Sequence, residues 1–135
     1  MMLDTSYIID LLRERTSQPG PATAFLERHR AVKLRMPLFV LCELELGVVR
    51  AGDPQGERHA LETLSEYIEP VFPGVGFAPI HARVVAGLLA AGTPIPVMDA
   101  LIGALAVQHS EPIVTRDTEH FGRIDGLVVL DHRAR

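Results

Sequence analysis

Short apolar runs alternate with segments of helical spacing along the whole chain, and this alternation restricts the fold more than any other feature. Runs of strand type lie at residues 1–3, 32–36, 71–72, 112–115 and 127–130. Helical patterns follow Asp4 and recur at residues 22–30, 38–49, 57–68, 79–91 and 99–109. Because helices separate successive strands, we expect an α/β fold with a parallel sheet covered on both faces.

The size and composition of the chain limit the classes of protein to which it can belong. With 135 residues and 47% hydrophobic composition, residues 1–135 are expected to form one domain. The single cysteine, Cys42, excludes an intrachain disulfide and, among leucines, is interpreted as a buried and inert thiol. The sequence has no apolar run of membrane-spanning length, so we expect no membrane partner and a cytoplasmic location.

The formal net charge of −4 ordinarily argues against a nucleic-acid partner. Carboxylates gathered around divalent cations change that interpretation, because each bound ion cancels two of their charges locally. The overall charge therefore excludes neither a nucleic-acid substrate nor a metal site.

Four acidic residues carry the strongest functional signal: Asp4, Glu43, Asp99 and Asp117. Three of them stand at a junction between an apolar run and the next element. In a parallel α/β sheet, such junctions line the edge at which ligands bind. Their position, more than the number of acids, indicates function.

Each acid also has a structural interpretation. Asp4 and Asp99 precede helical patterns and could cap a helix N-terminus, while Asp117 could be an ordinary turn residue. Glu43 lies in an apolar stretch, where an unpaired charge is costly unless it faces water or a cation. Considered together, the four acids predict a site for Mg²⁺ or Mn²⁺, which favour carboxylate oxygens. Such an ion can activate water for hydrolysis of a phosphodiester.

Four segments in this order resemble the PIN-domain ribonucleases, and most closely the VapC-type toxins of toxin–antitoxin pairs. The segments are LDTSYIIDLL, CELELGV, GTPIPVMDALIGALA and IVTRDTEHFGRIDGLVVL. Each motif alone is weak, but their order and separation are specific. The resemblance covers essentially the full chain.

The resemblance implies a PIN-like three-layer sandwich with about five parallel strands. It also implies an Mg²⁺- or Mn²⁺-dependent endoribonuclease that acts on RNA, forms a homodimer and binds a cognate VapB-type antitoxin. In this family pattern, the acids Asp4, Glu43, Asp99 and Asp117 are the catalytic and metal-binding residues. Two small polar residues, Ser6 and Thr115, accompany them.

Two departures from the family pattern stand out. Many relatives carry a further acid shortly before the third one, where this chain has Val97. This difference puts a second metal position in question. The opening strand is also very short, which predicts that Asp4 is less firmly anchored than usual.

Several cationic residues are candidates for binding RNA. Arg116, beside Asp117, is the first candidate for a phosphate contact, followed by Arg13 and Arg15 near the end of the first helix. His120 belongs to the His-Phe pair that commonly follows the last acid in the family. A packing role or a local hydrogen bond is the preferred interpretation of His120, with RNA contact as the alternative.

Other functions are compatible with the same residues. The chain could be a PIN nuclease of RNA processing that needs no antitoxin, or a catalytically inactive metal-binding member of the family. A receiver-like signalling module also collects aspartates and Mg²⁺ at a sheet edge. The absence of an adjacent acid pair after the first strand, and of a lysine near the acids, weakens that last alternative.

Overall fold

The structure, a computed structural model, describes residues 1–135 and contains one sheet of five parallel strands. The strands lie side by side in the order β3-β2-β1-β4-β5. Their bounds are Met2–Leu3 (β1), Arg35–Pro37 (β2), Glu69–Val71 (β3), Ile113–Thr115 (β4) and Val129–Asp131 (β5). The expected α/β class and the number of strands are confirmed.

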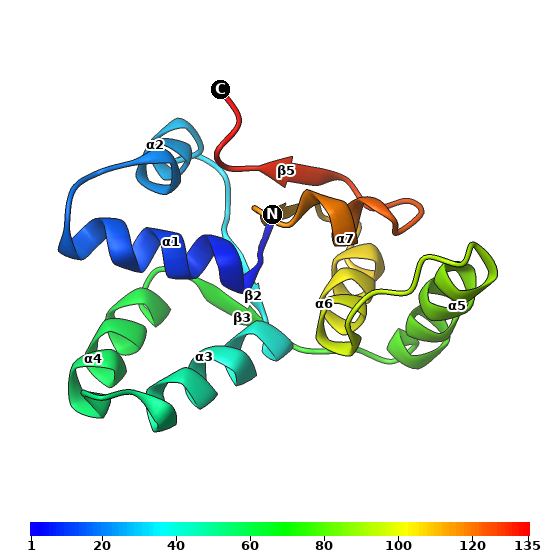
Figure 1. The fold of residues 1–135 in the computed structure, drawn as a ribbon, viewed down its shortest axis with the longest axis horizontal. Coiled ribbons are helices and arrows are strands. Elements are labelled where there is room, and N and C mark those ends of the chain that lie inside the picture. The colour runs from blue at the N-terminus through cyan, green and yellow to red at the C-terminus, as the bar shows by residue number, and fades with distance from the viewer.

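Seven helices surround the sheet, with α1 to α4 on the left and α5 to α7 on the right of the view in Figure 1. Their bounds are Thr5–Thr16 (α1), Pro21–Arg28 (α2), Leu38–Arg50 (α3), Pro54–Ser65 (α4), Phe77–Ala90 (α5), Val97–Gln108 (α6) and Thr118–Gly122 (α7). This layering matches the expected sandwich. None of the helices combines the length and the apolar character needed to cross a bilayer.

The strand order reverses direction beside β1, and this reversal fixes where a ligand can enter. From β1 the chain adds β2 and then β3 on one side, and it later adds β4 and then β5 on the other. In an open α/β sheet, the crevice beyond the carboxyl ends of the two strands at such a switch point is the usual binding site. Here those strands are β1 and β4, which immediately precede the segments that carry Asp4 and Asp117.

Several boundaries differ from the predicted ones. The Gly52-Asp53-Pro54 segment ends one helix as expected, but it also begins α4, because the Asp53 carboxylate accepts a hydrogen bond from the backbone N–H of Gly56. Helix α6 begins at Val97, directly after the extended Pro96, so Asp99 lies in its first turn and does not cap it. Helix α7 was not predicted, since five residues are too few to establish a period.

Helix α6 lies at the centre of the core, as its almost uniformly apolar sequence predicts. Ile102, Ala104 and Leu105 have no solvent exposure. The prediction for Cys42 is wrong, because this thiol is exposed on α3. Helix α3 is apolar around most of its circumference but buries fully only Val40 and Val48, so its apolar residues do not mark a single inner face.

A carboxylate on α1 caps the next helix. Glu14 accepts hydrogen bonds from the backbone N–H groups of Gly20, Ala22 and Thr23 at 2.8 to 2.9 Å, and from the Thr23 hydroxyl at 2.8 Å. Partial burial raises the pKa of Glu14, but these hydrogen bonds outweigh it and lower the pKa below its ordinary value. The anion at the N-terminus of α2 thus ties α1 to α2.

We expect Glu14→Ala to lower the free energy of unfolding by about 1–2 kcal/mol at pH 7, because backbone donors at the start of α2 lose their acceptor. The lowered pKa in the folded state makes this contribution complete above the ordinary pKa of about 4.3 and lost as the pH falls through the folded-state pKa. Urea unfolding at pH 7 and about pH 3 measures both effects, with the exposed Glu62→Ala as the matched control. An equal difference between wild type and Glu14→Ala at both pH values would contradict a charge-dependent cap.

Candidate functional site

Asp4 follows β1 and is held by two hydroxyl groups. Its Oδ2 atom accepts hydrogen bonds from Ser6 Oγ at 2.8 Å and from Thr115 Oγ1 at 2.7 Å, and the residue is only 5% exposed. Its backbone N–H donates to the carbonyl of Val114 on β4 at 2.9 Å. Asp4 is therefore firmly anchored, contrary to the expectation drawn from the short strand, because β1 is completely buried between β2 and β4.

The capping interpretation of Asp4 is not supported. Asp4 occupies the N-cap position of α1, but its side chain makes no capping hydrogen bond. The carboxylate is directed to the hydroxyl groups of Ser6 and Thr115 instead. The two small polar residues that the sequence groups with the acids thus contact the first of them directly.

Glu43 reaches the same region from the second turn of α3. Its Oε1 atom accepts a hydrogen bond at 2.8 Å from the hydroxyl of Thr5, the first residue of α1. Burial raises the pKa of Glu43, the hydrogen bond from Thr5 opposes this change, and the negative charges of Asp4 and Asp99 raise the pKa further. The net effect is a pKa above the ordinary value.

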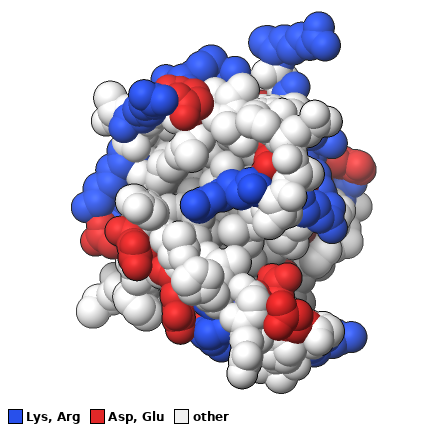
Figure 2. Space-filling view, turned by 90° about the vertical axis from the view of Figure 1, so that its left-hand side faces the viewer, with Lys and Arg blue, Asp and Glu red and all other residues white.

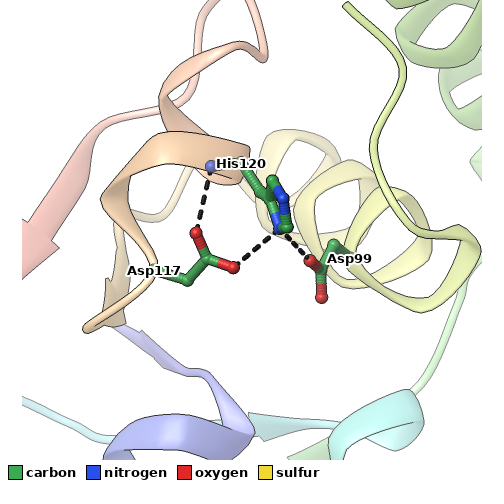
Figure 3. Close-up of side chains that lie close together, drawn as sticks. All are labelled: Asp99, Asp117 and His120. Carbon is green, nitrogen blue, oxygen red and sulfur yellow. Dashed lines mark hydrogen bonds and ion pairs between the residues drawn. The ribbon is translucent and has the colours of Figure 1, made fainter.

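Asp99 and Asp117 both point toward one ring nitrogen of His120 (Figure 3). The His120 Nδ1 atom lies 3.0 Å from Asp99 Oδ2 and 2.7 Å from Asp117 Oδ2. The other oxygen of Asp117 accepts a hydrogen bond from the His120 backbone N–H at 3.1 Å and so caps α7. The structural interpretation of Asp117 thus holds for one of its oxygens, while the second contacts the His120 ring.

The electrostatics of Asp99 connect these contacts with Asp4. Burial raises the pKa of Asp99, the hydrogen bond and charge of His120 lower it, and the negative charges of Asp4 and Asp117 raise it. The net direction is upward, as it is for Glu43. The four acids therefore act on one another electrostatically although four different segments supply them.

Thr115 connects the two groups of acids. Its hydroxyl donates to Asp4 and accepts a hydrogen bond from the backbone N–H of Asp117 at 2.9 Å. Ser6 Oγ lies 3.1 Å from the same hydroxyl. A chain of hydrogen bonds thus runs from the end of β1 to the start of α7. One ligand atom from each of Asp99, Asp117 and His120 lies within 4.8 Å of the others, which is compatible with a shared cation.

The three candidate arginines have different surroundings. The guanidinium of Arg116 donates to Asp10 at 2.7 Å, and the same carboxylate lies 2.9 Å from Nε2 of the buried His132. Arg13 lines a groove of about 400 Å³ together with Thr5 and Glu43. Arg15 lines a separate cavity, formed largely by residues of α1, α2 and the segment that leads into β2.

Basic side chains form no continuous band on the face shown in Figure 2. Lys and Arg side chains there alternate with Asp and Glu side chains. On this face a polyanion would therefore meet separate cationic positions. Among the candidate arginines, Arg13 is the one that shares a groove with Glu43.

Sequence reasoning missed three contacts around the acids. The hydrogen bond from Thr5 to Glu43, the two-carboxylate contact of His120, and the pairing of Asp10 with Arg116 were not predicted. The His-Phe pair gave a signal for His120, for which a packing role or a local hydrogen bond was the preferred interpretation. The other two contacts join residues that are 38 and 106 positions apart, and no local pattern indicates them.

A parallel α/β sheet with carboxylates gathered beyond the carboxyl ends of the two strands at its switch point, here β1 and β4, is found in a broad class of ligand-binding proteins. The comparison with known families is more specific, because the model of the PIN domain matches residues 1–127. This chain belongs to the PIN-domain family.

The chain is also similar to individual members of that family. It is 32% identical over 134 residues to a ribonuclease VapC of Rickettsia bellii, covering 96% of this chain and 94% of the relative. Its fold matches VapBC-1 of nontypeable Haemophilus influenzae with a TM-score of 0.87 and 25% identity, over 98% of both chains. VapBC2 of Rickettsia felis, bound to a promoter DNA fragment, matches with a TM-score of 0.87 and 21% identity over 95% of both chains. The predicted resemblance to VapC-type proteins is confirmed.

We expect Glu43→Gln to be more stable than the wild type at pH 7 in a buffer that contains a chelator. The raised pKa of Glu43 in the folded state means that its ionisation destabilises the fold above that pKa, while below the ordinary pKa of about 4.3 the penalty is absent. The glutamine keeps an oxygen that can accept the hydrogen bond from Thr5. The gain should not exceed about 1 kcal/mol, because water screens a partly exposed carboxylate.

Thermal unfolding of both proteins between pH 7 and pH 4 measures this effect, and the difference should shrink as the pH falls. Glu45→Gln on the same helix is the control, since Glu45 pairs with Arg58 and its replacement should bring no gain. A wild type that is more stable than Glu43→Gln at pH 7 without divalent ions would refute repulsion at this site.

Proposed function

We propose that this protein is a Mg²⁺- or Mn²⁺-dependent endoribonuclease and the toxin component of a VapBC-type toxin–antitoxin system. The observation that carries the proposal is the convergence of Asp4, Glu43, Asp99 and Asp117 at the switch point of the sheet. Burial, and to a lesser extent the negative charges of neighbouring acids, raise the pKa values of Glu43 and Asp99, as expected for carboxylates gathered at a cation site. Membership of the PIN-domain family and similarity to proteins named ribonuclease VapC support the same reaction.

The donor set fits a hard divalent ion. The four carboxylates would hold it, with Asp4 oriented by the hydroxyls of Ser6 and Thr115. When bound, such an ion lowers the pKa of a water molecule and neutralises charge on a phosphodiester. Val97 is 74% exposed and offers no ligand oxygen, so we infer one fully liganded ion position.

The residues of the chain have different roles in the proposed reaction. One oxygen of Glu43 accepts a hydrogen bond from Thr5, which leaves the other oxygen to accept a proton from the attacking water. Asp99 and Asp117 fix the opposite side of the site through α6 and α7. Thr115 holds both Asp4 and the backbone of Asp117, so the carboxylates keep their relative positions during the reaction.

The partners follow from the same reasoning. The names VapC and VapBC of the similar proteins support a VapB-type antitoxin as partner. Exposed apolar residues on α3 and α5, namely Leu46, Val49 and Leu89, support a homodimer.

The receiver-like alternative gains no support, because the only lysine, Lys33, pairs with Glu69 on β3, away from the acids.

We expect Asp4→Asn and Asp99→Asn each to reduce metal-dependent RNA cleavage by at least about 100-fold, because each removes a charged ligand. Cleavage of a fluorogenic RNA in the presence of Mn²⁺ measures the loss, and circular dichroism confirms that the variants fold. The matched control is Asp125→Asn, an exposed aspartate in the loop after α7 that should retain full activity. Undiminished cleavage by both site variants would exclude the proposed centre.

We expect Arg13→Ala to weaken RNA binding by about three- to tenfold, because the guanidinium lines the groove that also contains Thr5 and Glu43. Arg15→Ala serves as the control, since Arg15 lies on the same helix but lines the other cavity. Fluorescence anisotropy with a short labelled RNA, measured on the inactive Asp99→Asn background, gives both affinities. A larger loss for Arg15→Ala than for Arg13→Ala would show that RNA follows a different path.

A further inference from the structure

We propose that His120 is itself a ligand of the divalent ion, so that Nδ1 of its ring joins Asp99 and Asp117 in a mixed nitrogen and oxygen site. This inference rests on the metal centre of the proposed function. It departs from the carboxylate ligand set predicted from the sequence, in which His120 has a packing or hydrogen-bonding role.

The spacing of the three donor atoms carries the inference. The His120 Nδ1 atom lies 3.0 Å from Asp99 Oδ2 and 2.7 Å from Asp117 Oδ2. In an octahedral site with bonds of about 2.1 Å, neighbouring ligand atoms lie about 3.0 Å apart. Each carboxylate oxygen therefore lies at about the separation of an adjacent ligand from the His120 nitrogen, and all three donor atoms lie within 4.8 Å of one another.

A hydrogen-bonding role explains the arrangement less completely. The Nδ1 atom of an imidazole carries at most one hydrogen, and here it faces two carboxylate oxygens at hydrogen-bond distance. One hydrogen cannot make two full hydrogen bonds, whereas one ion can bind the nitrogen and both oxygens. Both carboxylates point toward the same ring atom in Figure 3, as ligands of a shared ion would.

The start of α7 fixes the ring in this position. Asp117 accepts a hydrogen bond from the His120 backbone N–H and so holds the first turn of the helix. Phe121, the next residue, has no solvent exposure and anchors the segment in the core. The His120 side chain remains 32% exposed, so an ion from solution can reach it. The imidazole is therefore presented to the carboxylates by the backbone and remains accessible.

The identity of the ligand has a consequence for metal choice. Imidazole nitrogen suits transition metals, while Mg²⁺ favours carboxylate, carbonyl and water oxygens. A site that includes His120 should therefore select Mn²⁺ over Mg²⁺ more strongly than the carboxylates alone would. Removing the ring should reduce this preference without abolishing metal binding.

The test uses the intact protein with Mn²⁺ as the probe. Electron spin echo envelope modulation should detect a ¹⁴N nucleus coupled to bound Mn²⁺ in the wild type, and the signal should change when histidine is labelled with ¹⁵N. In His120→Ala the coupling should disappear. By calorimetry, the Kd for Mn²⁺ should rise about tenfold or more and that for Mg²⁺ by less than about twofold. His120→Gln provides a second variant if the alanine protein does not fold.

The control is His59→Asn, which replaces an exposed histidine on α4 and should keep the nitrogen coupling. Bound Mn²⁺ without nitrogen coupling in the wild type would overturn the His120 ligand and leave the carboxylate centre intact. Coupling that persists in a folded His120 variant would assign it to another histidine and also overturn the inference. Absence of any Mn²⁺ binding would overturn both this inference and the metal centre of the proposed function.

Discussion

The hydroxyl of Thr115 makes the hydrogen bonds on which the arrangement of the acids depends. It donates to Asp4 at the end of β1 and accepts from the backbone of Asp117 beyond β4. Between β1 and β4 the order in which the chain adds strands reverses, so the carboxyl ends of these two strands meet at the crevice. A single small side chain thus sets the relative position of acids that are distant in sequence.

Ionisation of the acids lowers the stability of the folded state. Glu43 and Asp99 have raised pKa values because burial and neighbouring negative charge disfavour their ionised forms. Hydrogen bonds from Thr5 and His120 offset part of this cost. The repulsion is confined to one edge of the sheet, while the apolar residues of α6 beyond Asp99 and those of the central strands form part of a continuous apolar core. The apolar core therefore compensates a local repulsion that a bound cation would relieve.

The sequence predicted the fold class and the positions of acids at the ends of strands, because both produce local patterns. Apolar runs that alternate with helical spacing indicate a parallel sheet, and acids such as Asp4 and Asp117 stand where those runs end. The buried state of Cys42 was predicted wrongly, because α3 is apolar on more faces than it buries. The contacts of His120 and Arg116 depend on segments that only the folded chain brings together, and α7 is too short for its period to be detected.

Four separate segments of the chain supply the acids, and Asp4 and Thr115 are 111 positions apart. In the unfolded polypeptide these groups are dispersed, so it presents no comparable place for an ion. By mass action, a ligand that binds only the native state deepens its free-energy minimum by an amount that grows with the logarithm of the ligand concentration. The concentration of divalent cations would therefore affect the resistance of the protein to proteolysis, in addition to any role of the ion in catalysis.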